Sequence, residues 1–318
     1  MRRNTMRTML RLLGPALLAV LLWRLPKSED VLTTMASASP LPIIAAVALN
    51  FVAIQIKVQR WRLLLRARDI HYPMRQAWPA FVSSLYLAML TPGRIGDALR
   101  ARYLRHDLGT PYAEGLASVV VDRIFDLYVL LGFVAFGVAR FSAVLSGDLA
   151  IVTWGGFLAI LVAPLFLLLP GTGDRLMRAV FTRIGSRVGS DAVDNFTESA
   201  RTQFFRALPK AGALTLAGFS VNYLQGWLIA SAMHLDISVA DIVALMAMAA
   251  LLGLLPISVS GVGVRELLFA LVFPLLGIAA AVGVSFGLVL FASIYLSLAL
   301  IGFVSWQVAP PPTETSAK

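Results

Sequence analysis

Three charged residues lie inside an apolar stretch of the sequence. Asp122, Arg123 and Asp126 begin about seven residues into the run "GLASVVVDRIFDLYVLLGFVAFGVAR". In a helix, both carboxylates share one face, and Arg123 reaches Asp126 at the i,i+3 spacing. A charge at the centre of a bilayer costs about 2.5–3.5 kcal/mol on insertion scales, so such residues are functional candidates. The alternative is a purely structural role, in which the three residues pin neighbouring helices.

A second charged set follows a Pro-Gly break. The stretch "LTPGRIGDALRARYLR" contains Pro92, Gly93, Arg94, Gly96, Asp97 and Arg100. A helix that begins near Ile95 presents unpaired backbone N–H groups and the positive end of its dipole. Guanidinium groups bind phosphate oxygens with two parallel hydrogen bonds. The pattern favours an anionic headgroup as ligand. The alternative is that these arginines only hold a loop on one side of a membrane.

A third set also combines glycines with an arginine and an acid. The stretch "SVSGVGVRELLF" contains Ser258, Ser260, Gly261, Gly263, Arg265 and Glu266. The glycines allow close approach of the backbone, and an arginine and an acid follow them directly. The three histidines are scattered, and the sequence has no P-loop or Gly-x-Ser-x-Gly motif. We therefore expect no metal, no cofactor and no enzymatic activity.

The amino-acid composition indicates which class of protein contains these three charged sets. Of 318 residues, 58% are hydrophobic and 14% are charged, with a mean hydropathy of +0.81. Soluble domains carry about 25% charged residues. The sequence therefore predicts an all-α polytopic membrane protein. The net charge of +10 then indicates cytoplasmic loops and anionic lipid headgroups rather than nucleic acid.

Apolar runs of about 20 residues predict the membrane spans. Six transmembrane helices are expected at about 9–25, 41–57, 115–139, 149–169, 211–233 and 280–307. Two segments interrupted by Pro and Gly, 77–106 and 241–278, are interpreted as re-entrant helical hairpins, with full spans as the alternative. The first apolar run also resembles part of a signal peptide, but "ASA" at 36–38 lies too far beyond it, so a retained span is favoured.

Basic residues predict the orientation. One crowded group is Lys57, Arg60, Arg62, Arg66, Arg68 and Arg75, assigned to a loop. A second is Arg175, Arg178, Arg183, Arg187, Arg201, Arg206 and Lys210. The connections 141–148 and 234–240 contain no Lys or Arg. The positive-inside rule then places both basic groups and both termini in the cytoplasm, in a protein of the cytoplasmic (inner) membrane.

The order of spans and hairpins predicts an internal symmetry. Residues 1–308 are expected to form a single integral membrane domain with inverted halves, 1–140 and 149–308. Inverted halves with broken helices in corresponding places indicate a transporter site near the midplane. The segment 171–210 is expected either as a helix in the cytoplasmic interface or as a soluble connecting helix. The tail 309–318 is expected to be disordered.

The three motifs, in this order and spacing, resemble those of the lysylphosphatidylglycerol synthase transmembrane-region family, also called flippase-like domain proteins. The family's Pro-Gly-x-x-Gly-[Asp/Glu]-x-x-Arg falls on 92–100, its acid-Arg-x-x-Asp on 122–126, and its Gly-x-Gly-x-Arg-Glu on 261–266. Members often carry Asn shortly before the first Pro-Gly, where this chain has "LAML". The resemblance spans nearly the whole chain. It implies a bacterial-type inner-membrane protein related to the part of the synthase that flips the aminoacylated lipid.

The residues and the resemblance together predict a lipid flippase or transporter for an anionic or phosphate-bearing lipid. Arg94, Arg100, Arg123 and Arg265 would face phosphate, and the acids would pair with them or exchange protons. The synthase's aminoacyltransferase domain is not found in this sequence, so lysine transfer is not expected. Two alternatives stay open. One is an intramembrane lipid-modifying enzyme with Asp97 or Asp122 as general base, and the other is a non-catalytic subunit of a lipid-pathway enzyme.

Overall fold

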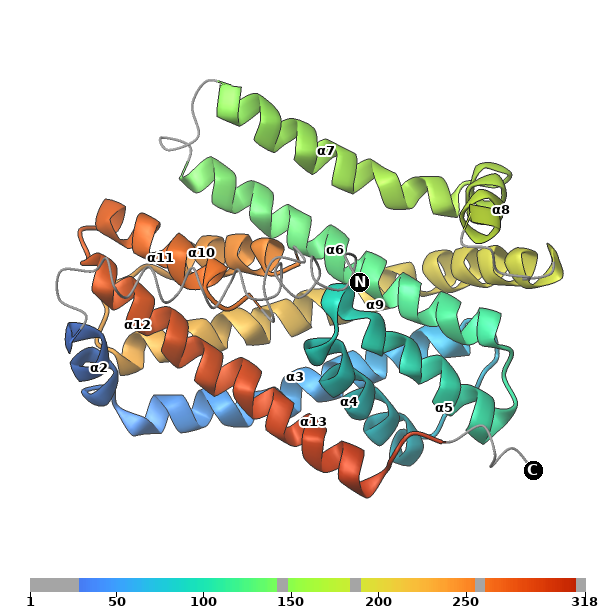
Figure 1. The fold of residues 1–318 in the computed structure, drawn as a ribbon, viewed down its shortest axis with the longest axis horizontal. Coiled ribbons are helices and arrows are strands. Elements are labelled where there is room, and N and C mark those ends of the chain that lie inside the picture. The colour runs from blue at the N-terminus through green and yellow to red at the C-terminus, as the bar shows by residue number, and fades with distance from the viewer. Residues whose placement is uncertain (1–28, 142–147, 184–189, 255–260, 313–318) are drawn as a thin grey trace, which may run out of the picture.

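The protein is an elongated bundle of helices. The computed structural model describes residues 29–141, 148–183, 190–254 and 261–312, and every element in these ranges is helical. Most of the long helices run side by side along the bundle (Figure 1). The predicted all-α class is therefore confirmed. The expected first span at 9–25 lies outside the described residues.

The predicted spans that fall in the described ranges coincide with long helices. These helices are α3 (Pro40–Arg66), α6 (Tyr112–Arg140), α7 (Asp148–Leu168), α9 (Ser190–Ala232) and the continuous run of α12 (Ala280–Leu290), the π-helix η4 (Phe291–Leu296) and α13 (Ser297–Val308). Among the described residues, two helices, 40–66 and 280–308, are long and apolar enough to cross a membrane alone. A third is added if α7 and α8 (Thr172–Arg183), which meet at 98°, form one bent span. The count of six spans stays a prediction.

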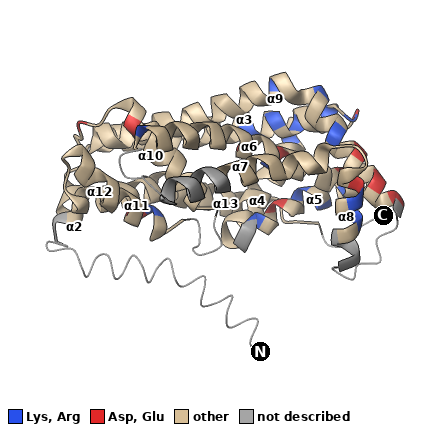
Figure 2. Cartoon of the chain, turned by 90° about the horizontal axis from the view of Figure 1, so that it is seen from above, with Lys and Arg blue, Asp and Glu red and all other residues tan. Residues whose placement is uncertain are grey.

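Charged residues are concentrated at one end of the bundle. Figure 2 shows Lys and Arg gathered around α5 (Leu99–Leu108), α8 and the start of α9, whereas charged residues are sparse along the rest of the bundle. This is the distribution that the positive-inside rule gives for one face of a membrane protein.

The boundary predicted at residue 57 was wrong, because α3 continues to Arg66. Lys57 and Arg60 therefore lie within a helix rather than in a loop. The helix continues because its apolar positions keep a three-and-four spacing that can be buried against neighbouring helices. Those positions are Ile54, Val58, Trp61 and Leu65, all of them buried.

The polar segment 171–210 is divided between two helices. α8 takes its first part, and residues 190–210 form the first half of α9, which continues through Pro209 without a break. The buried positions Phe196, Ala200, Phe204 and Ala207 keep helical spacing and pack in one core cluster with α6 residues. This packing holds the polar half of α9 in line with its apolar half, and the two form one helix of 43 residues.

The segment predicted as the first hairpin, called the first hairpin below, forms α4 (Met74–Leu90), the 3-10 helix η1 (Pro92–Ala98) and α5. That it re-enters the membrane stays a prediction. Thr91 fixes its turn: its hydroxyl donates to the carbonyl of Leu87 at 2.8 Å and accepts from the N–H of Gly96 at 2.9 Å. A Cβ at Gly96 would lie 2.3 Å from the backbone of Leu87 and Ala88, so only glycine fits where η1 crosses the end of α4.

The segment predicted as the second hairpin, called the second hairpin below, contains α10 (Val239–Leu252), α11 (Val264–Val272) and the 3-10 helix η3 (Phe273–Leu276). Its re-entrant course likewise stays a prediction. Gly261 and Gly263 have φ values of 79° and 86°, a region that residues with a Cβ rarely adopt. These two glycines allow the backbone to turn into the start of α11. Ser258 and Ser260 lie outside the described residues.

Candidate functional site

Asp122 is the centre of a buried ion-pair network. Its Oδ1 accepts from Arg60 Nε at 2.8 Å, and its Oδ2 accepts from Arg100 at 3.0 Å and from Arg123 at 2.7 Å. The carboxylate is fully buried. Because these arginines come from α3, α5 and α6, a single acid fixes three helices to one another.

Asp126 lies one turn further along α6 and faces a more open space. Arg60 approaches its Oδ1 at 2.6 Å, and Arg123 approaches its Oδ2 at 2.9 Å. Arg60 also donates to the hydroxyl of Thr215 on α9 at 2.9 Å. The expected contact between Arg123 and Asp126 is confirmed. Unlike Asp122, the Asp126 side chain is 22% exposed.

Asp97 joins the first hairpin to this network through longer contacts. Its oxygens lie 3.5 Å from Arg94, 3.6 Å from Arg100 and 3.7 Å from Arg123. These distances exceed those of hydrogen bonds, and Asp97 Oδ2, Arg94 Nε and Arg123 Nε have no hydrogen-bond partner among the described residues. Asp97 is therefore joined to these three arginines by charge attraction rather than by short hydrogen bonds.

Arg94 adopts a backbone conformation that is unusual for its type. Its φ is 57°, in the left-handed region, which costs a non-glycine residue about 1–3 kcal/mol and persists only where its surroundings impose it. The side chain is 37% exposed and lines a cavity. Strain of this kind is concentrated at binding sites, so the turn presents Arg94 to this cavity at an energetic cost.

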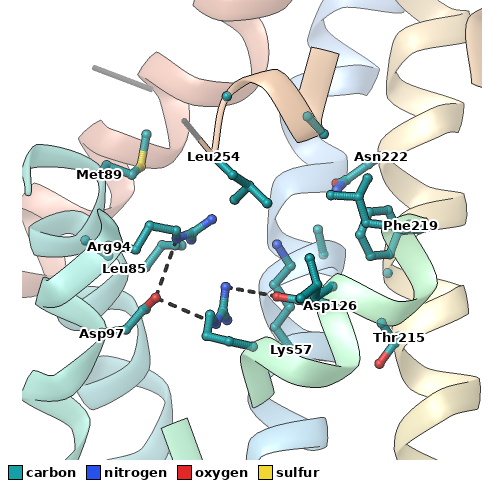
Figure 3. A pocket seen from close by; sticks show the side chains of 18 of the residues that line it. Lys57, Leu85, Met89, Arg94, Asp97, Asp126, Thr215, Phe219, Asn222 and Leu254 are labelled. Carbon is teal, nitrogen blue, oxygen red and sulfur yellow. Dashed lines mark ion pairs between the residues drawn. The ribbon is translucent and has the colours of Figure 1, made fainter. Parts of the chain in front are cut away.

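The cavity has a volume of about 780 Å³ and is surrounded by both hairpins, α3, α6, α9 and the π-helix. Its carboxylates are Asp97 and Asp126, and its cations are Lys57, Arg60, Arg94, Arg123 and Arg265. Most of the remaining wall is apolar. Figure 3 shows Arg94 and Asp97 on one side, Asp126 in the middle, and Phe219 and Asn222 on the other side, from α9.

Arg265 brings the second hairpin to the same cavity. It pairs with its neighbour Glu266 at 2.6 Å, and the other oxygen of Glu266 accepts from the N–H of Gly263 at 2.6 Å. Its guanidinium lies 5.5 Å from the ring centre of Phe291 and 5.0 Å from that of Tyr295, within the range of cation–π attraction. Both aromatic rings belong to the π-helix, and π-helices occur often at functional sites.

The structure places the predicted site residues that it describes in three groups. Arg94, Asp97, Arg123, Asp126, Gly261 and Arg265 line the cavity. Arg100, Asp122 and Glu266 are buried behind its wall, where they hold the first group in place. Gly96 and Gly263 shape the turns, and Pro92 and Gly93 begin η1.

Charge in the network is not balanced. Arg60, Arg94, Arg100 and Arg123 surround three aspartates, which leaves one positive charge in excess. Lys57 adds another, whereas Arg265 is neutralised by Glu266. An uncompensated charge at depth in a membrane is costly, and an anion in the cavity would offset it.

The sequence patterns did not indicate that Lys57, Arg60 and Thr215 belong to the site. Lys57 and Arg60 were assigned to a loop because they follow an apolar run. Their i,i+3 spacing, with Ile54, Val58 and Trp61 still in helical register, was the signal that could have found them. Thr215 offered no signal, since a single threonine in a span is ordinary.

Other polar residues of the spans bond between helices. Gln225 on α9 donates to Asn50 on α3 at 2.9 Å, and Asn50 donates to the hydroxyl of Ser297 on α13 at 2.6 Å. Interhelical bonds of this type hold membrane helices together. Asn222 and Tyr223, in contrast, line the cavity.

Comparison with known proteins identifies the family. The sequence model of the lysylphosphatidylglycerol synthase TM region matches residues 11–302. The chain belongs to this family. The family expected from the three motifs is thus confirmed, and in this chain residues of all three motifs line one cavity.

Several curated proteins are similar to the chain. Glycosyltransferase AglD of Haloferax volcanii is 24% identical over 80% of this chain, which spans 47% of that protein. A UPF0104 membrane protein of Methanothermobacter thermautotrophicus is 29% identical over 48% of the chain and 41% of its own length. A UPF0104 membrane protein of Methanocaldococcus jannaschii is 22% identical over 88% of each chain. The protein is thus a multi-pass membrane protein, and it spans about half the length of the first two relatives.

Proposed function

We propose that the protein is a lipid flippase or lipid transporter that moves an anionic or phosphate-bearing lipid between the leaflets of the cytoplasmic membrane. The observation that carries this proposal is the cavity between the two hairpins, which combines an excess of positive charge with mostly apolar walls. An anionic lipid complements both features, because its headgroup is negatively charged and its chains are apolar.

The chemistry of the cavity suits a phosphate headgroup. Arg94 and Arg123 both reach the cavity, and both are joined to Asp97 only by contacts of 3.5 and 3.7 Å. Phosphate oxygens can replace such a loose partner with short charge-assisted hydrogen bonds. The volume of about 780 Å³ lies within the range of about 300–1,000 Å³ for ligand pockets.

The arrangement gives less support to an intramembrane enzyme. A general base needs a carboxylate oxygen that is open to the substrate proton. Every carboxylate oxygen of Asp97, Asp122 and Asp126 has a guanidinium nitrogen within 3.7 Å. These acids therefore set the positions of the arginines and are poorly placed to take protons.

A second candidate role is that of a membrane subunit beside a lipid-pathway enzyme. It is favoured by the similarity to Glycosyltransferase AglD, which this chain matches over 47% of that protein's length. A partner enzyme that co-purifies with the protein in a fixed ratio would support this role. Transport by the pure protein alone would show that no partner is needed.

For the topology we propose six full spans and two re-entrant hairpins in inverted halves, with both termini cytoplasmic. The chain has no cysteine, so single cysteines can be introduced without removing native ones. Cysteines placed in 141–148 and 234–240 are expected to react with an impermeant maleimide in whole cells. Cysteines in 171–210 are expected to react only after the cells are opened. Labelling of 171–210 from outside would overturn this topology.

Transport itself is tested by reconstitution. The purified protein is placed in liposomes with fluorescent lipids whose headgroups are phosphate monoesters, anionic phosphodiesters or zwitterions. We expect anionic lipids to change leaflet faster than in protein-free liposomes, because the excess positive charge of the cavity attracts their headgroups. Rates equal to those of empty liposomes across the panel would contradict the proposal.

A further inference from the structure

Lys57 is a cation in the cavity with no bonded partner. It lies on α3, is half-buried and lines the cavity, and it makes no ion pair or hydrogen bond with any residue that the structure describes. Its charged neighbours are Asp126, Arg94, Arg123 and Arg60. Figure 3 shows it beside Asp126. Lys57 is thus surrounded mainly by charges of its own sign.

The nearby acids are bonded to arginines and, within the described part of the chain, make no ion pair or hydrogen bond with Lys57. Arg60 and Arg123 each take one oxygen of Asp126, at 2.6 and 2.9 Å. Arg60 takes one oxygen of Asp122, and Arg100 and Arg123 share the other. The ammonium group of Lys57 therefore keeps its three N–H donors for something that enters the cavity.

We propose that Lys57 is the primary contact for the phosphate of the transported lipid and that it makes the cavity selective for a phosphomonoester over a phosphodiester headgroup. This inference rests on the proposed lipid-binding function of the same cavity. Lysine binds phosphate as a point charge and needs no fixed orientation. A headgroup can therefore reach it without first displacing an aspartate from an arginine.

The selectivity follows from the charge count. With Lys57, the network carries two positive charges in excess of its three carboxylates. A phosphomonoester carries a charge of about −1.5 to −2 at pH 7, which nearly neutralises this excess, whereas a phosphodiester carries a single negative charge. Without Lys57 the excess falls to one, which matches the diester.

The test compares two soluble probes, dodecyl phosphate as the monoester and dihexanoyl-phosphatidylglycerol as the diester. Their binding to the full-length protein in maltoside micelles is measured by titration calorimetry. We expect the wild-type protein to bind the monoester at least about tenfold more tightly, and Lys57→Met to lose about that factor for the monoester alone. Lys57→Arg keeps the charge and should keep the preference. Lys210→Met removes an exposed lysine of α9 and should change neither affinity.

The outcomes separate this inference from the proposed function. If the wild-type protein binds neither probe, the headgroup site itself is refuted. If it binds the monoester and Lys57→Met binds it equally well, the headgroup site stands and the role of Lys57 is refuted. Removing a charge that faces mostly like charges should not lower the unfolding temperature. If Lys57→Met is nevertheless unstable, a well-folded Lys57→Arg protein without the monoester preference refutes the role.

Discussion

Replacing Asp122 with asparagine is expected to cause the largest loss of stability of any single change in the network. The substitution keeps the size of the side chain but removes the negative charge that Arg60, Arg100 and Arg123 share. Removing one member of a buried ion pair costs about 3–5 kcal/mol. Thermal unfolding in detergent and the yield of monodisperse protein measure this loss.

The matched control is Asp194→Asn. Asp194 also pairs with an arginine, Arg178 at 2.8 Å, but both side chains are more than half exposed. Water and salt screen such a pair, so the unfolding temperature should stay close to that of the wild-type protein. An Asp122→Asn protein that unfolds at the wild-type temperature would show that the network is not what holds α3, α5 and α6 together.

Replacing Asp126 with asparagine is expected to abolish transport while the protein stays folded. The Asp126 side chain is 22% exposed and lines the cavity, so water can solvate the arginines that lose their partner. The change therefore costs less stability than Asp122→Asn. The amide no longer holds Arg60 and Arg123 in the geometry that phosphate requires. We expect the transport rate per folded protein to fall by at least about tenfold, which corresponds to about 1.4 kcal/mol.

Arg123→Lys extends the same test. Arg123 contacts Asp97, Asp122 and Asp126 through different nitrogens, which a lysine ammonium cannot reproduce. This variant should also lose transport. A well-folded Asp126→Asn protein with undiminished transport would mean that the three residues of α6 only pin helices, the structural alternative raised by the sequence.

The sequence predicted the motifs that carry the site, because each stands at a visible break in an apolar pattern. Pro92 and Gly93 marked the turn before Arg94, and Gly261 and Gly263 marked the turn before Arg265. Asp122 and Asp126 were conspicuous because charges inside an apolar run are costly. The structure brings these three sets to one cavity, which the resemblance and the predicted symmetry had implied.

The partners of these motifs could not be predicted, for a physical reason. Arg60 bonds to Asp122 across 62 positions of the sequence, and nothing local indicates such a pairing. Basic residues after an apolar run usually mark a loop, so Lys57 and Arg60 were placed outside the membrane span. The packing of Trp61 and Leu65 into the core stabilises α3 as a helix beyond them. The excess of positive charge in the cavity became visible only in three dimensions.

We propose that the cavity carries a phosphate-bearing headgroup across the membrane. The most direct measurement is leaflet exchange of a fluorescent lipid phosphomonoester in liposomes that contain, on average, about one protein each, with folding verified after reconstitution. We expect exchange in the protein-containing vesicles at a rate clearly above that of protein-free vesicles, and inhibition by added dodecyl phosphate. Correctly folded wild-type protein that leaves the rate at the protein-free value, for this lipid and for the rest of the anionic panel, would contradict the account.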